Sequence, residues 1–261
     1  MPTIEIEERD VFITQANDRA PGPTILYIHG AASSSAVWPP PLTHLPAIHC
    51  VALDLPGHGA SLPPGRRSVE QYAHFVEDFI IAQALSGITI VGHSMGSAIA
   101  LSLARRAVVD VRGLFLLGAA ARMPVSEAIL KGSVNSLSDV ASWIADNALI
   151  EATPAQRDAV RRQVTQTGET TTFGDFLACN RFDLRAQVAS ILVPALIVAG
   201  TLDQMTPLRF SESLAAGLPH GRLATLEGCG HFSMLERTEV VKELLIDFIT
   251  HFDSASAPPG Q

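Results

Sequence analysis

Ser94 stands in the segment GHSMG, directly after the apolar run ITIV at residues 88–91. Gly92 and Gly96 lie two positions to either side of the serine. This spacing is typical of a tight turn between a strand and a helix, where larger side chains would collide. Such a turn presents the serine hydroxyl at a helix N-terminus, which favours developing negative charge. The segment therefore predicts a nucleophilic serine, which needs a general base because a neutral hydroxyl is a weak nucleophile.

Short apolar runs rich in β-branched residues must supply the strands that position this serine. Runs without polar alternation are typical of strands buried on both faces of a parallel sheet. Amphipathic helical patterns lie between the runs, so the sequence predicts an α/β fold with right-handed crossovers, and the first residues predict an edge hairpin. The strand runs lie at 24–30, 49–57, 88–94, 113–119, 195–201 and 222–228, and the helical patterns at 68–85, 94–108, 207–218 and 236–252.

Residues 122–184 interrupt this alternation, because they contain helical patterns and no convincing strand. We expect Thr153 and Pro154 to begin a helix there, and SLSDVASWIADNALI and FGDFLACNRF to form short helices. An insert between two core strands is expected to cap the carboxyl edge of the sheet, where ligands bind. The predicted division is a core at 1–121 and 185–252, a helical cap at 122–184 and a disordered tail at 253–261.

Five segments of the chain resemble motifs of the serine α/β-hydrolase family, in particular its carboxylesterase-like members. Each follows a predicted strand, and they occur in the order of the family. The resemblance extends over roughly residues 20–252 and implies a mostly parallel, twisted sheet of about eight strands flanked by helices. The segments are HGAAS (29–33), DLPGHGAS (54–61), GHSMG (92–96), GTLDQMTP (200–207) and GCGHFSMLE (228–236).

The resemblance implies that His231 is the general base and that Asp203 is the carboxylate orienting it, in the chain order serine, acid, histidine. Some family members carry the acid after the preceding strand, but residues 118–122 read GAAAR and hold no carboxylate. Asp54 is the rival acid, and we expect it to organise its own turn instead. His93 is expected to pack beside the strand, because neighbouring side chains diverge at a tight turn.

An acyl-transfer intermediate also needs two hydrogen-bond donors for its oxyanion. The resemblance implies that these are the backbone N–H groups of Met95, which follows the serine, and Ala31, which follows His-Gly. For the substrate pocket we expect residues that adjoin the motifs or lie in the cap, namely Ala32, Trp143, Phe173, Phe176, Met205 and Phe232.

The composition limits the classes of partner. The 261 residues are 47% hydrophobic and 17% charged, as in a globular protein, and a net charge of −8 without a basic stripe argues against nucleic acid. The three separated cysteines indicate no disulfide framework and favour a reducing cytoplasm. The chain shows no signal-peptide pattern and no apolar stretch long enough to span a membrane. The nine histidines lie in no ligand-spaced cluster, so no metal is expected.

The motifs and the family resemblance therefore predict a cofactor-free serine esterase. It is expected to cleave a small or medium, mostly apolar carboxylic ester through an acyl-enzyme on Ser94. A carbon–carbon bond hydrolase of ring-cleavage diketones, a lactonase and a thioesterase would use the same triad. A slow-turnover ligand receptor on the same fold is the non-enzyme alternative. The sequence does not distinguish these by substrate, and it leaves the oligomeric state open.

Overall fold

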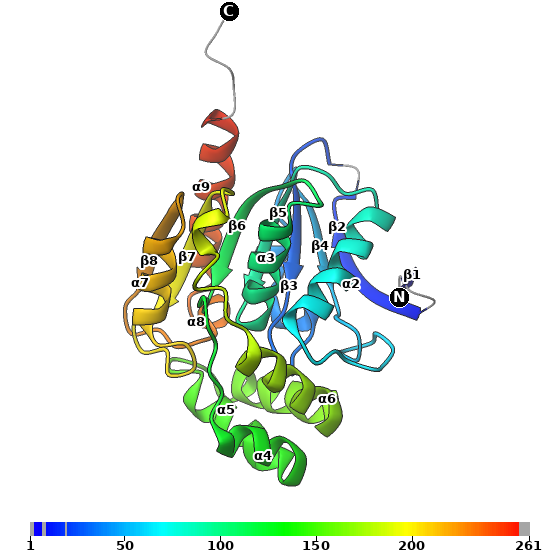
Figure 1. Cartoon of the computed structure of the whole chain (residues 1–261), viewed down its shortest axis with the longest axis vertical. Coiled ribbons are helices and arrows are strands. Elements are labelled where there is room, and N and C mark those ends of the chain that lie inside the picture. The colour runs from blue at the N-terminus through cyan, green and yellow to red at the C-terminus, as the bar shows by residue number, and fades with distance from the viewer. Residues whose placement is uncertain (1–2, 7–8, 19, 256–261) are drawn as a thin grey trace, which may run out of the picture.

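An eight-stranded sheet forms the centre of the computed structural model, which describes residues 3–6, 9–18 and 20–255 (Figure 1). Its strands are β1 (Thr3–Ile6), β2 (Arg9–Ala16), β3 (Thr24–Ile28), β4 (His49–Leu53), β5 (Ile88–His93), β6 (Val111–Leu117), β7 (Ala195–Gly200) and β8 (Gly221–Leu226). Their order across the sheet is β1-β2-β4-β3-β5-β6-β7-β8. Strands β3 to β8 pair in parallel, whereas β2 is antiparallel to β1 and to β4. The mostly parallel sheet and the antiparallel edge hairpin are therefore confirmed.

Helices cover both faces of the sheet and one of its ends (Figure 1). Two short 3-10 turns, Ser35–Val37 and Val188–Ser190, lie in the connections. The helices are α1 (Pro40–Thr43), α2 (Val69–Ala82), α3 (Met95–Arg106), α4 (Glu127–Asn135), α5 (Leu137–Asn147), α6 (Pro154–Arg181), α7 (Leu208–Gly217), α8 (Ser233–Glu236) and α9 (Thr238–Ala255).

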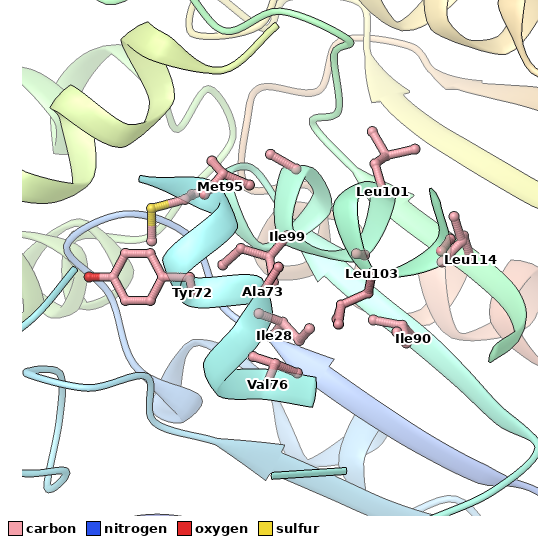
Figure 2. Packing of buried hydrophobic residues seen from close by; sticks show 14 of the residues in the cluster. Ile28, Tyr72, Ala73, Val76, Ile90, Met95, Ile99, Leu101, Leu103 and Leu114 are labelled. Atoms are coloured by element: carbon pink, nitrogen blue, oxygen red, sulfur yellow. The ribbon is translucent and has the colours of Figure 1, made fainter. Parts of the chain in front are cut away.

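The strands separate two apolar cores, which explains why their sequences lack polar alternation. Successive residues of β5 point to opposite faces, so Ile90 packs with α2 and α3 whereas Val91 packs on the face of α1 and α9. Figure 2 shows the first core, in which Ile28, Ile90 and Leu114 of three neighbouring strands belong to one cluster with Ile99 and Leu103 of α3. Each fully buried aliphatic side chain stabilises the fold by about 2 kcal/mol, so this double core holds the strand ends rigidly.

The predicted insert forms α4, α5 and α6, which lie together at one end of the sheet, between β6 and β7 in the chain (Figure 1). Thr153 and Gln156 form a capping box around Pro154, which confirms the predicted start of α6. The predicted helix in FGDFLACNRF lies in the second part of α6, which non-helical backbone at Gly168, with φ 79° and ψ 164°, separates from the first part. The division into a core and a cap domain stays a prediction.

The C-terminal helix α9 continues to Ala255, beyond the predicted start of the tail at residue 253. The rest of that predicted tail, residues 256–261, lies outside the described residues. Across the described ranges, no helix is both long enough and apolar enough to cross a membrane.

Candidate active site

Ser94 occupies a strained turn between the last residue of β5 and the first residue of α3. Its backbone has φ 52° and ψ −117°, a conformation that residues with a side chain rarely adopt. Its N–H donates to the carbonyl oxygen of Leu117 on β6 at 2.9 Å. A Cβ at Gly92 would lie 2.6 Å from the carbonyl oxygen of Gly96, and one at Gly96 would lie 2.1 Å from that of Ile28. Both glycines are therefore required by close approach, as the sequence predicts.

His231 and Asp203 form a buried pair. His231 Nδ1 donates to Asp203 Oδ2 at 2.8 Å, and the two side chains are 4% and 1% exposed. Asp203 follows β7, and its Oδ1 accepts the backbone N–H groups of Met205 and Thr206 at 2.8 and 2.9 Å. Burial raises the pKa of Asp203, but the charge of His231 and the hydrogen bonds from His231 and Thr206 outweigh burial, so this pKa is lowered. The ionised carboxylate therefore holds the proton on His231 Nδ1 and leaves Nε2 as the acceptor.

The end of β6 brings Ser94 and His231 together. The carbonyl of Leu117 binds Ser94, and the next residue, Gly118, lies under the His231 ring: a Cβ at Gly118 would be 2.7 Å from His231 Cε1. Gly118 also has φ 57°, which favours glycine. The segment GAAAR predicts only that no acid follows β6, and it does not indicate that its glycine makes room for the His231 ring.

Thr206 is a second residue that the motif analysis did not single out. Its hydroxyl donates to Asp203 Oδ2 at 2.8 Å and lies 3.2 Å from His231 Nδ1, so it contacts both members of the pair. Its position before Pro207 in GTLDQMTP was the available signal, but only the fold shows that the hydroxyl turns back to the carboxylate.

His93 lies beside the pair but is unsuited to accept a proton. Its Nε2 donates to the backbone carbonyl of His231 at 3.1 Å, and its ring packs against the rings of His231 and Phe232 at 4.7 and 4.8 Å. Burial first, and then the proximity of His231, lowers the pKa of His93 to about 3. His93 therefore stays neutral near pH 7 and supports the His231 loop, which agrees with the expectation that it packs beside the strand.

A cavity of about 190 Å³ opens over Ser94. Of the predicted pocket residues, Trp143, Phe176 and Met205 line it. Its wall is mostly apolar and joins loops at the ends of the strands to α4, α5 and α6, so the cap helices cover the serine. The lining residues are Ala31, Ser94, Met123, Pro124, Val125, Ser126, Ile129, Trp143, Phe176, Cys179, Gln204, Met205, Thr206 and Phe210.

The other three predicted pocket residues do not line this cavity. Ala32 is 1% exposed, because its backbone turns inward and its N–H donates to Asp175 Oδ2 at 2.8 Å. Phe232 packs edge-on against His231, with ring centres 5.7 Å apart, and so lies behind the histidine. Phe173 is half-buried on α6, three residues before Phe176, and is not among the residues that line the cavity.

Both predicted oxyanion donors lie close to Ser94: Met95 follows it in the chain, and Ala31 lines the same cavity. Met95 is the first residue of α3, so its N–H has no acceptor within the helix. Ala31 follows β3 and lines the cavity together with Ser94. Gly30 permits this approach, because a Cβ there would lie 3.2 Å from the Cβ of Ser94. Their role as an oxyanion hole stays a prediction.

Asp54, the rival acid, is engaged elsewhere. Its Oδ1 accepts the N–H of Ser35 at 2.6 Å and its Oδ2 accepts the N–H of Ala60 at 2.9 Å, which confirms that it organises its turn. His29 accepts the N–H of Leu55 on Nε2 at 3.0 Å, which is a structural role. In the part of the chain that the structure describes, no group of three or more His, Cys, Asp or Glu residues is arranged to hold a metal ion.

Comparisons with known proteins agree with this fold. A pimeloyl-[acyl-carrier protein] methyl ester esterase of Neisseria meningitidis serogroup B is 30% identical over 249 residues, covering 86% of this chain and 92% of the relative. A solved thermophilic esterase has a TM-score of 0.86 at 26% identity, covering 96% of this chain and 97% of that one. The enol-lactonase of Burkholderia xenovorans LB400 shares the fold, with a TM-score of 0.87 at 21% identity, covering 95% of this chain and 100% of that one. The model of the alpha/beta hydrolase family matches residues 25–244, and the chain belongs to that family.

Proposed function

We propose that this protein is a serine carboxylic-ester hydrolase, with Ser94 as nucleophile, His231 as general base and Asp203 as the orienting acid. The observation that carries the proposal is the position of Ser94 in a strained turn beneath an apolar cavity, next to a buried His231–Asp203 pair. The chain also belongs to the alpha/beta hydrolase family and is similar to two proteins named as esterases, which supports this activity.

In the proposed reaction, the hydroxyl oxygen of Ser94 attacks the ester carbonyl carbon while His231 Nε2 takes the hydroxyl proton. The N–H groups of Met95 and Ala31 bind the oxyanion of the tetrahedral intermediate. The carbon–oxygen bond to the alcohol then breaks, and His231 returns the proton to the leaving oxygen. Water, deprotonated by His231, then attacks the acyl carbon; the bond to Ser94 Oγ breaks, His231 returns the proton to that oxygen, and the acid is released. Asp203 stabilises the imidazolium in both steps.

The substrate that fits this site is a small or medium, mostly apolar ester. The cavity measures about 190 Å³, and apolar side chains such as Val125, Ile129, Trp143 and Phe176 contribute most of its lining. The polar side chains that line it besides Ser94 are Ser126, Gln204 and Thr206, of which Thr206 is bonded to Asp203. Such walls favour an alkyl or aryl group over a polyanion. No cofactor is needed for any step.

We infer a cytoplasmic location from the cysteines, because Cys50, Cys179 and Cys229 are free and buried. Free thiols are typical of proteins in a reducing compartment. The net charge of −8 likewise favours a small-molecule substrate over nucleic acid.

The test is steady-state hydrolysis of p-nitrophenyl acetate, butyrate and octanoate by the full chain and by Ser94→Ala. The proposal predicts turnover of the short esters and its loss by at least about a thousandfold in the variant. Turnover that survives in Ser94→Ala would overturn the role of the serine. A burst of about one equivalent without turnover would instead favour a slow-turnover ligand receptor. Cleavage of only diketones, lactones or thioesters would show that the substrate is not a simple carboxylic ester.

A further inference from the structure

Asp175 of α6 is a fully buried carboxylate with three donors from three other parts of the chain. Its Oδ2 accepts the backbone N–H of Ala32 at 2.8 Å and a proton of His58 Nε2 at 2.7 Å. Its Oδ1 accepts the hydroxyl proton of Tyr72 at 2.6 Å. A buried carboxylate is costly unless it is paired and hydrogen-bonded. Asp175 meets this condition through hydrogen bonds that connect α6 to α2 and to the loops after β3 and β4.

Tyr72 shows how this junction joins the core. Its ring belongs to the apolar cluster between α2 and the sheet, and Figure 2 shows its hydroxyl at the edge of that cluster, pointing away from the labelled apolar side chains. The hydroxyl also accepts the backbone N–H of Arg66 at 2.9 Å. The Tyr72 hydroxyl therefore bonds to Oδ1 of Asp175, whereas Ala32 bonds to Oδ2.

The bond to Ala32 acts on the loop that carries a proposed oxyanion donor. Ala32 has φ 51°, a left-handed conformation that needs support in a residue other than glycine. Its N–H belongs to the peptide between Ala31 and Ala32, so Asp175 fixes that peptide directly behind the N–H of Ala31. The same loop is held again where Ser33 Oγ donates to Gln163 Oε1 of α6 at 3.0 Å.

His58 balances the negative charge of the Asp175 carboxylate, which would otherwise repel an oxyanion nearby. Both of its ring nitrogens face oxygen acceptors: Nδ1 lies 3.1 Å from the carbonyl oxygen of Pro56, and Nε2 lies 2.7 Å from Asp175. A ring with two acceptors carries protons on both nitrogens. Burial lowers the pKa of His58, but the charge of Asp175 and the hydrogen bonds outweigh it, so this pKa is raised. The imidazolium neutralises the carboxylate, which then orients the loop without opposing the charge of the intermediate.

We infer that Asp175 is a positioning residue for the proposed ester hydrolysis: it holds the Ala31–Ala32 turn so that the N–H of Ala31 points at the oxyanion. The inference rests on the proposed function of Ser94. It makes the second half of α6 a part of the oxyanion hole as well as a wall of the pocket. Loss of the Ala32 contact is expected to weaken binding of the transition state much more than binding of the ester.

Asp175→Ala and Asp175→Asn test this role against Tyr72→Phe. The alanine variant removes the acceptor of Ala32, and removal of one oxyanion donor lowers kcat by about a hundredfold or more. The asparagine variant keeps one acceptor oxygen and is expected to recover most of that loss. Tyr72→Phe breaks a bond to the same carboxylate without touching Ala32, so it should lower the Tm but leave kcat within about threefold. KM should stay within about threefold in all three variants.

The result that would overturn the inference is a kcat of Asp175→Ala within about threefold of that of Tyr72→Phe at matched folded fraction, or a loss that appears only in KM. If Asp175→Ala does not fold, Asp175→Ser is compared with Tyr72→Phe by the same criterion, because the shorter serine side chain also leaves the N–H of Ala32 without this acceptor. A wild type without esterase turnover would instead count against the proposed function. In that case the rate of Ser94 phosphonylation by a fluorophosphonate tests Asp175, because that reaction also develops negative charge on an oxygen; equal rates in the wild type and Asp175→Ala would contradict the inference.

Discussion

Gly118 leaves the space that the imidazole of His231 fills: a Cβ at Gly118 would lie 2.7 Å from Cε1 and 2.8 Å from Nδ1 of that ring. Nδ1 makes the hydrogen bond to Asp203 and Cε1 is bonded to Nδ1, so a shift of the ring away from the added carbon would disturb that hydrogen bond. The neighbouring carbonyl of Leu117 holds Ser94. The end of β6 therefore sets the relative position of the proposed nucleophile and base.

Gly118→Ala is expected to lower kcat by about a hundredfold or more, because a displacement of about 1 Å in a reacting group can cost that much. The matched control is Gly168→Ala. Gly168 also has a positive φ, 79°, but an added Cβ there meets nothing within 4 Å. Both variants should lose stability through backbone strain, and only Gly118→Ala should lose activity. Equal activities of the two variants, measured with p-nitrophenyl butyrate, would contradict the role of Gly118.

Thr206→Val tests the hydroxyl that donates to Asp203 at 2.8 Å. The variant keeps the backbone N–H bonds to Asp203 but removes a bond that lowers the pKa of this carboxyl. We expect kcat to fall by about tenfold, the equivalent of about 1.4 kcal/mol, with little change in KM. Thr206→Ser keeps the hydroxyl and should stay close to wild type. The account of Thr206 is wrong if Thr206→Val and Thr206→Ser have the same kcat.

The chain-length preference tests the apolar wall. Trp143 lines the cavity and is 41% exposed, so Trp143→Ala opens the pocket at little cost in stability. The ratio of kcat/KM for octanoate over butyrate should rise by about fivefold or more. Val134→Ala is the control, because Val134 is 48% exposed on α4 and does not line the cavity. An unchanged ratio of kcat/KM in Trp143→Ala would show that Trp143 does not contact the acyl chain.

The sequence predicts the part of this site that is local along the chain. The turn at Ser94 follows from two glycines, and the start of α6 follows from Thr153 and Pro154, because neighbours in sequence determine both geometries. The contact of Gly118 with His231 and that of Asp175 with Ala32 join segments more than a hundred residues apart. Such pairs depend on how the helices pack against the sheet. For the same reason the sequence does not show which aromatic residues of residues 122–184 line the cavity. Phe176 lines it, whereas Phe173, less than one turn earlier on the same helix, does not.

His58 makes stability depend on pH in a defined direction. Its pKa in the folded protein is raised above the usual value of about 6.5, so its stabilising contribution is complete below about pH 6.5 and is lost as the pH rises through the folded value. The groups that face its ring are Asp175, Asp54, His29 and Tyr72. We expect the Tm of the wild type, relative to that of His58→Gln, to decrease between about pH 6 and pH 9. Parallel curves of Tm against pH for the two proteins would show that His58 carries no extra proton.

Covalent labelling of the full chain by a fluorophosphonate, located by peptide mass mapping, tests the central claim most directly. The serine oxygen displaces fluoride from phosphorus, so we expect one adduct, on Ser94. The labelled fraction of the protein should equal the fraction of esterase turnover that is lost. His231→Ala should label far more slowly, and Ser94→Ala should not label. An adduct on another residue, or wild-type turnover that persists after Ser94 is fully labelled, would contradict the assignment of Ser94 as the nucleophile.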